Sequence, residues 1–300
     1  MRGIGLGLPY NRNFKEAQET MRVAIQGEPG SFSHEAAIRV APEATIFPCA
    51  LSADVFAAVD EGRVDAAVIP IENSLAGPVA EHYDLLLMHD VAIESESLLR
   101  IRHNLIAMPD VSLEQVERVC SHPVALAQCR KFLAAHPRME AVPFYDTAGS
   151  VKQLMADGDA KMAGIASAQA AVHYGGEILA AGIEDNPENY TRFFLIRKRS
   201  LVKIDARPDK VSLAFTVENR PGTLVAALEV FASQGTNLTR IESRPVHGSP
   251  WQYVFFADYQ LSSPETADAA LKLLAEHCSM VKELGRYRAA SDGLSATRHA

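Results

Sequence analysis

Apolar and polar positions follow a recurring order along residues 22–200: a short apolar run, a few small polar residues, and then a stretch with helical spacing. This order occurs five times, with the small polar segments at 27–33, 72–74, 121–123, 146–150 and 166–167. Such an order is typical of an α/β domain with mainly parallel strands. It also places free backbone N–H groups at several helix N-termini, where anions bind.

Two extended stretches interrupt this order, one at 91–101 and 104–108 and the other at 191–197. They predict that the chain crosses twice between two α/β lobes, about 22–100 with 190–200 and 101–189. Open α/β sheets bind ligands beyond the carboxyl ends of their strands. We therefore expect the small polar segments to converge on a cleft between the lobes.

The pattern changes after a polar linker at 201–210. Strands are expected at 211–217, 238–246, 252–260 and 281–287, with helices at 223–233 and 264–278. The resulting β-α-β-β-α-β order predicts a ferredoxin-like second domain, 211–288. Polar tails are expected at 1–21 and 289–300, and Met21, directly before the first strand, is a candidate translation start.

The composition argues against several classes of function. A net charge of −8 over 300 residues argues against a nucleic-acid partner, which requires a basic surface. There is no long apolar run and no secretory signal, so we expect a cytoplasmic protein with no membrane partner. Cys49, Cys120, Cys129 and Cys278 lack metal-ligand spacing, and no nucleotide-binding or metalloprotease motif is present. We therefore expect no metal and no cofactor.

The chemistry with the strongest signal lies where the loop 185–190 enters a strand. Thr191 and Arg192 are consecutive, so in a strand they point to opposite faces. A guanidinium can grip a carboxylate, and a hydroxyl can donate to a substrate oxygen. The alternative is a capped loop with a surface salt bridge. Glu72 could act as a general acid if it is buried, or could simply pair with a helix terminus.

Four short motifs resemble, in order, those of prephenate dehydratases: Glu72-Asn73-Ser74, Ser121-His122-Pro123 with Gln128, Asp146-Thr147-Ala148 and Thr191-Arg192-Phe193. The segment 238–245 is similar to the regulatory motif that these enzymes carry on an ACT domain. The resemblance covers about residues 21–287. It implies a bilobed catalytic domain of the periplasmic-binding-protein type II kind at 22–200 and an ACT domain at 211–288. No chorismate mutase segment precedes residue 22, so the resemblance is to the monofunctional form.

The family converts prephenate to phenylpyruvate, water and carbon dioxide on the route to phenylalanine, without a metal or cofactor. The resemblance implies that Thr191 donates to the leaving hydroxyl, that Glu72 is a second candidate donor, and that Arg192 binds a carboxylate or holds the loop. The implied substrate-binding residues are Asn73, Ser74, Ser121, Gln128, Thr147 and Phe193.

The resemblance also implies inhibition by phenylalanine, bound between the ACT domains of a homodimer or homotetramer. The implied effector residues are Gly222, Thr223, Leu224, Val225, Asn237, Leu238, Glu242, Ser243, Arg244 and Pro245. Two alternatives stay open: an arogenate dehydratase, which acts on the aminated substrate, and a non-catalytic binding protein that senses an amino acid.

Overall fold

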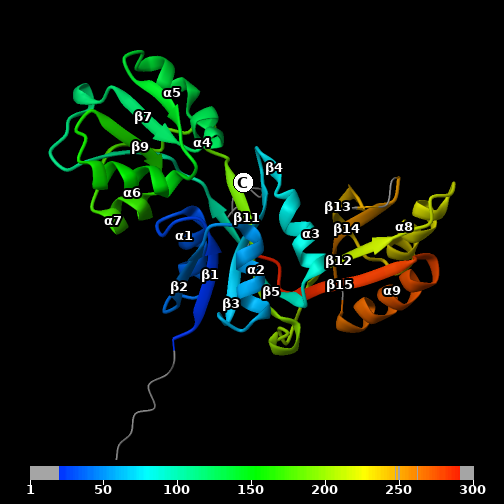
Figure 1. Cartoon of the computed structure of the whole chain (residues 1–300). Helices are drawn as coiled ribbons and strands as arrows, with labels where there is room; N and C mark the ends of the chain where they lie inside the picture. The colour runs from blue at the N-terminus through cyan, green and yellow to red at the C-terminus, as the bar shows by residue number, and fades with distance from the viewer. Residues whose placement is uncertain (1–19, 247, 249–250, 262, 291–300) are drawn as a thin grey trace, which may run out of the picture.

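The computed structural model describes residues 20–246, 248, 251–261 and 263–290. The tails expected at 1–21 and 289–300 lie almost entirely outside these residues. The described chain forms three sheets, which Figure 1 shows as three bodies in a row with the N-terminal lobe in the middle. None of the described helices combines the length and apolar character needed to cross a membrane.

The first lobe is built on a six-stranded sheet in the order β2-β1-β3-β11-β5, with the short β4 added beside β3. Its helices are α1, α2 and α3. The bounds are β1 (Arg22–Gln26), α1 (Phe32–Val40), β2 (Thr45–Cys49), α2 (Ser52–Asp60), β3 (Ala66–Asn73), β4 (Gly77–Pro78), α3 (Ala80–Met88), β5 (Val91–Arg100) and β11 (Tyr190–Lys198).

The second lobe has a five-stranded sheet in the order β10-β6-β9-β7-β8. The bounds are β6 (Asn104–Ala107), β7 (Arg118–Ser121), α4 (Pro123–Gln128), α5 (Arg130–Ala135), β8 (Glu140–Pro143), α6 (Thr147–Asp157), β9 (Met162–Ala166), α7 (Ala168–Tyr174) and β10 (Glu177–Ala181). Single 3-10 turns lie at Leu113–Gln115 and Arg199–Leu201.

Both sheets are mixed, which corrects the expectation of mainly parallel strands. The β1–β2, β1–β3, β7–β8 and β7–β9 pairs are parallel, but β11 runs antiparallel to β3 and β5, and β6 runs antiparallel to β9 and β10. The reason is that the crossing segments do not pass outside the sheets. They join them as strands, and a chain that returns from the other lobe enters in the opposite direction.

Several element boundaries also differ from the expectation. Helices α1 and α6 begin three to four residues earlier than the apolar spacing indicated, because Ser31 and Asp146 cap them with side-chain oxygens that accept backbone N–H groups. Strands β2 and β10 and helix α2 were not anticipated. The helical stretch that follows the polar segment 121–123 is broken at Cys129 into α4 and α5.

The C-terminal domain has the predicted β-α-β-β-α-β order and forms a four-stranded sheet, β13-β14-β12-β15. Its elements are β12 (Lys210–Thr216), α8 (Thr223–Ser233), β13 (Leu238–Pro245), β14 (Tyr253–Gln260), α9 (Pro264–His277) and β15 (Met280–Tyr287). One face of this sheet packs on α8 and α9, a core that includes Phe231, Tyr259 and Leu274.

The other face of the C-terminal sheet packs against the first lobe. One apolar cluster contains Phe194 of β11 and Tyr83 of α3 together with Phe256, Leu284 and Tyr287 of the C-terminal sheet. Figure 1 shows β15 beside the base of α3 and β5. The Nζ of Lys282 lies within 2.9–3.2 Å of the carbonyls of Leu86, Leu87 and His89, at the end of α3. The two domains therefore share a continuous core.

The closest approach in this interface is at Gly285, where a Cβ atom would lie 2.4 Å from the carbonyl oxygen of Ile93 on β5. We predict that Gly285→Ala lowers the free energy of unfolding by about 1–3 kcal/mol, because two backbones must separate to admit one methyl group. Urea unfolding followed by fluorescence checks this. A Gly285→Ala variant whose free energy of unfolding stays within about 0.5 kcal/mol of the wild type would contradict the close packing, since that is the range of substitutions at sites without tight contacts.

Candidate active site

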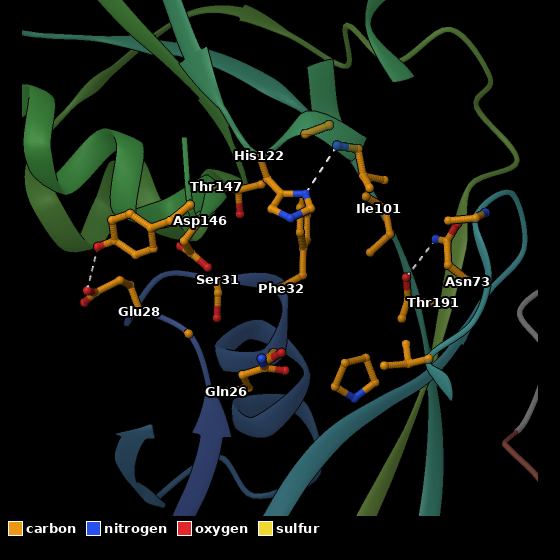
Figure 2. Close-up of a pocket in the computed structure, with 18 of the residues that line it drawn as sticks. Gln26, Glu28, Ser31, Phe32, Asn73, Ile101, His122, Asp146, Thr147 and Thr191 are labelled. Atoms are coloured by element: carbon orange, nitrogen blue, oxygen red, sulfur yellow. Dashed lines mark hydrogen bonds between the residues drawn. The ribbon is translucent and has the colours of Figure 1, made fainter. Parts of the chain in front are cut away.

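A cleft of about 610 Å³ lies between the two lobes. Gln26, Ser31 and Asn73 line it from the first lobe, and His122 and Thr147 line it from the second. Figure 2 shows these side chains directed toward a common space. The cleft lies at the carboxyl ends of β1, β3 and β7, where the sequence placed the small polar segments.

Thr191 stands on β11 opposite Asn73 of β3. The Nδ2 of Asn73 donates to the hydroxyl oxygen of Thr191 at 2.9 Å, as the dashed line in Figure 2 shows. The Oδ1 of Asn73 accepts the backbone N–H groups of Leu75 and Ala76 at 3.0 and 2.8 Å. These two hydrogen bonds fix the orientation of the Asn73 amide, and this amide fixes the position of the Thr191 hydroxyl oxygen.

Two further polar side chains line the cleft behind this pair. The Oε1 of Gln128 accepts from the Nδ2 of Asn189 at 3.0 Å and lies 2.9 Å from the Nε2 of His103. Burial lowers the pKa of His103, more than the contact with Gln128 raises it, so its imidazole is neutral near pH 7. Gln128 thus joins α4 of the second lobe to both crossing segments.

Helix N-termini face the cleft from both lobes. Ser31 caps α1 and Asp146 caps α6, and Thr147 is the first residue of α6. All three line the cleft. The uncapped N–H groups of the first turns and the helix dipoles favour a negatively charged ligand here.

The charged groups at the cleft surface are acidic. Glu28 accepts from the hydroxyl of Tyr145 and the ammonium of Lys152, both at 2.9 Å. Burial alone would raise the pKa of Glu28, but these two partners hold it below its usual value. Among the described residues that line the cleft, none is a lysine or arginine. An anionic ligand must therefore be held by N–H and O–H groups and helix dipoles.

Of the predicted site residues, Asn73, Gln128, Thr147, Thr191 and Phe193 line the cleft. Ser121 and Ser74 have structural partners instead. The hydroxyl of Ser121 is fully buried and donates to the carbonyl of Ile165 at 2.6 Å. The hydroxyl of Ser74 donates to the carbonyl of Glu188 and accepts the N–H of Tyr190.

Arg192 and Glu72 require a correction. Both were expected to be catalytic, but neither lines the cleft, because their positions on β11 and β3 direct them to the opposite face of the sheet. Arg192 donates to Glu96 at 2.7 Å, to Asp258 at 2.5 Å and to the Tyr287 hydroxyl at 3.0 Å. Glu72 accepts from Arg240 at 3.1 Å. Both side chains therefore bind the C-terminal domain.

The predicted effector residues fall on two elements of the C-terminal domain. Gly222 precedes α8, which begins with Thr223, Leu224 and Val225, and Val225 is exposed. The Nδ2 of Asn237 donates to the side chain of Gln260. The remaining five residues lie on the edge strand β13: Leu238, Glu242, Ser243, Arg244 and Pro245.

Two of these β13 residues make ion pairs. Glu242 accepts from Arg240, and Arg244 donates to both carboxylate oxygens of Asp84 on α3, at 3.0 and 2.7 Å.

Sequence reasoning missed four other residues that line the cleft, Glu28, Ser31, His103 and Asp146, and it missed the buried Asn189 beside them. Ser31 and Asp146 had a signal, since each is the last polar residue before a helix. His103 and Asn189 had none, because their importance depends on two crossing segments that lie 86 residues apart in the chain and meet only in the folded protein.

Asp146 provides a test of the electrostatics. Burial raises its pKa above the ordinary value of 3.8, against the opposing hydrogen bonds to Gly149 and Ala148. A raised carboxyl pKa means that the folded state binds the proton more tightly, so stability is lost as pH rises through the ordinary and the raised pKa.

We predict that Asp146→Asn is at least as stable as the wild type at pH 7, since asparagine keeps the cap but carries no charge. Asp146→Ala loses the cap and about 1 kcal/mol. Denaturation at pH 7 and pH 4 checks both. The advantage of asparagine over aspartate should shrink toward pH 4, and an advantage that grows there would contradict the raised pKa.

Comparison with known proteins agrees with this geometry. The family model "Prephenate dehydratase" matches residues 23–201, and the model "ACT domain" matches residues 211–272. An Arabidopsis thaliana protein, "Arogenate dehydratase/prephenate dehydratase 2, chloroplastic", is 40% identical over 278 residues, covering 89% of this chain and 72% of the relative.

Two solved structures are similar over nearly the whole chain. Prephenate dehydratase from Arthrobacter aurescens in complex with L-Phe is 33% identical with a TM-score of 0.82, covering 90% of both chains. A protein described as "GqqA- a novel type of quorum quenching acylases" is 34% identical with a TM-score of 0.83, covering 90% of this chain and 98% of that one. With both family models matched in order, this chain belongs to the prephenate dehydratase family of lyases and carries a C-terminal ACT domain.

Proposed function

We propose that the protein catalyses the decarboxylating dehydration of prephenate to phenylpyruvate, water and carbon dioxide. The observation that carries this proposal is the Thr191 hydroxyl, held by Asn73 at the wall of a cleft that helix N-termini make favourable for anions. Loss of the ring carboxylate supplies the electron pair that makes the ring aromatic and expels the ring hydroxyl. The dianionic substrate takes up one proton, which leaves with that hydroxyl as water.

The role of Thr191 follows from its hydrogen bond. The amide nitrogen of Asn73 can only donate, so the Thr191 oxygen accepts and its own hydrogen stays available for the leaving hydroxyl. A fixed donor at the point where negative charge develops stabilises the transition state. Since the hydroxyl of threonine is a weak acid, the net proton comes from solvent through this contact.

Binding of the two carboxylates follows from the electrostatics of the opposite wall. Cationic side chains do not line the described cleft, so Ser31, Thr147 and the first turns of α1 and α6 supply the N–H and O–H donors. The paired Glu28 and the raised pKa of Asp146 reduce the repulsion that two acids would otherwise exert.

Arogenate is a second candidate substrate, because the Arabidopsis thaliana relative is named for both activities. It differs from prephenate only in carrying an ammonium group where prephenate has a keto group, and both would present the same ring hydroxyl to Thr191.

We expect purified protein to form phenylpyruvate from prephenate at neutral pH, measured by its absorbance in alkali, with arogenate assayed in parallel. Thr191→Ala should lower kcat about 10²-fold or more, because a positioned proton donor contributes about 10²–10⁴. Thr191→Ser keeps the hydroxyl and should stay within about tenfold of wild type. Turnover by Thr191→Ala within a factor of two of wild type would show that this role is wrong.

Regulation by phenylalanine, in a homodimer or larger assembly, is a further part of the proposal. The ACT domain is present, and the Arthrobacter aurescens relative was solved with L-Phe. Strand β13, which carries half of the predicted effector residues, contacts the catalytic domain through Arg240–Glu72 and Arg244–Asp84. Glu72 directly precedes Asn73, so a shift of β13 reaches the residue that holds Thr191.

We predict that Asp84→Asn uncouples the two domains without removing the effector site. L-Phe should still bind by calorimetry, but its effect on the apparent substrate affinity should fall at least about fivefold, within the usual range of coupling energies. Asp268→Asn is the matched control, since Asp268 is exposed on α9 and pairs with Arg286 of its own domain. Undiminished inhibition in Asp84→Asn would exclude the Arg244–Asp84 contact as a route.

A further inference from the structure

Five polar side chains from the two lobes and the segments that join them form one continuous chain of hydrogen bonds. In order they are Thr191, Asn73, Asn189, Gln128 and His103. The central member, Asn189, is fully buried. Its Oδ1 accepts from Asn73 at 2.8 Å, and its Nδ2 donates to Gln128 at 3.0 Å. The chain therefore joins Thr191 to a helix of the second lobe.

The direction of every hydrogen bond in this chain is set at one end. The N–H groups of Leu75 and Ala76 occupy the Oδ1 of Asn73, which leaves its Nδ2 to face the other members. That nitrogen donates to Thr191 at 2.9 Å and to Asn189 at 2.8 Å, with a longer contact of 3.2 Å to the Tyr190 carbonyl. An amide nitrogen has no lone pair to accept with, so both partners must present oxygen acceptors.

The same logic continues through Asn189. Since its Oδ1 is the acceptor for Asn73, its Nδ2 is the donor and Gln128 presents Oε1. That oxygen also lies 2.9 Å from the Nε2 of His103, so Nε2 carries the hydrogen. The Nδ1 of His103 then carries no hydrogen and has a free lone pair. It is buried and has no hydrogen-bond partner among the described residues.

We propose that Asn189 is a positioning residue for the dehydration, resting on the proposed function of this cleft. Its carboxamide accepts from Asn73 on one side and donates to Gln128 on the other, and so links the residue that holds Thr191 to the second lobe. The same direction of hydrogen bonding makes His103 a neutral tautomer with its hydrogen on Nε2, so that Nδ1 is left as an acceptor. Asn189 touches no reacting atom and acts through Asn73.

The direction of the hydrogen bonds in this chain can be measured without an activity assay, from the tautomer of His103. Long-range ¹H–¹⁵N correlation spectra of the full-length protein labelled at histidine distinguish the two tautomers, and His103→Gln assigns the signal. Wild-type His103 should be the Nε2–H tautomer. In Asn189→Asp the carboxylate cannot donate, so the Gln128 amide rotates and His103 should change to the Nδ1–H tautomer. Asn186→Asp is the matched control, because Asn186 lies in the same loop, is exposed and only accepts the N–H of Glu188.

Kinetics test the positioning role. Asn189→Ala should lower kcat at least tenfold while KM changes less than threefold, because substrate contacts remain but Asn73 loses its link to Gln128 and the second lobe. Asn186→Ala should keep both constants within twofold. A wild-type Nδ1–H tautomer, or an Asn189→Ala kcat within twofold of wild type, would overturn the proposal. If the wild type turns over neither prephenate nor arogenate, the proposed function fails. The tautomer of His103 still shows in that case whether the hydrogen bonds run in the direction proposed.

Discussion

The structure depends on strand β11, whose successive side chains face two different environments. Thr191 faces the cleft, and the next residue, Arg192, faces the ACT domain. Arg192 is almost fully buried between Glu96 and Asp258, and Lys210 completes the group on Glu96. Burial alone would raise the pKa of Asp258, but Arg192 and Ser212 hold it below its usual value. The four charges balance, which is what makes their burial tolerable.

This arrangement lies within the core that the first lobe and the ACT domain share. Separation of the ACT domain from the first lobe would part Arg192 from Asp258 and from the Tyr287 hydroxyl, and of these described partners only Glu96 of β5 would remain. The apolar contacts of Phe194 and Tyr287 surround the same group. Separation of the domains is thereby disfavoured, and β13 is joined to the first lobe through Glu72 and Asp84.

In the cleft, the electrostatic question is how an anion is bound. The dianionic substrate proposed above would meet a wall that has helix N-termini and small hydroxyl side chains but, among the described lining residues, no lysine or arginine. Dipoles and N–H groups hold an anion without committing a full positive charge, which would also stabilise the ground state of the carboxylate that must be lost. The single arginine of the Thr191-Arg192-Phe193 motif is used for domain docking instead.

The sequence alone determined the elements and much of the cleft. Period-two and helical patterns predicted most strands and helices, the β-α-β-β-α-β domain, and the opposite directions of Thr191 and Arg192, because these depend on local spacing. It cannot decide which face of β11 meets the cleft and which meets the ACT domain, which is why the sequence motifs alone indicate a catalytic role for Arg192 and Glu72. It also gave no sign of His103 and Asn189, whose hydrogen bonds through Gln128 join segments distant in the chain. Only the packed structure decides these roles, since the partner of a buried polar group is chosen by the fold and not by its neighbours in sequence.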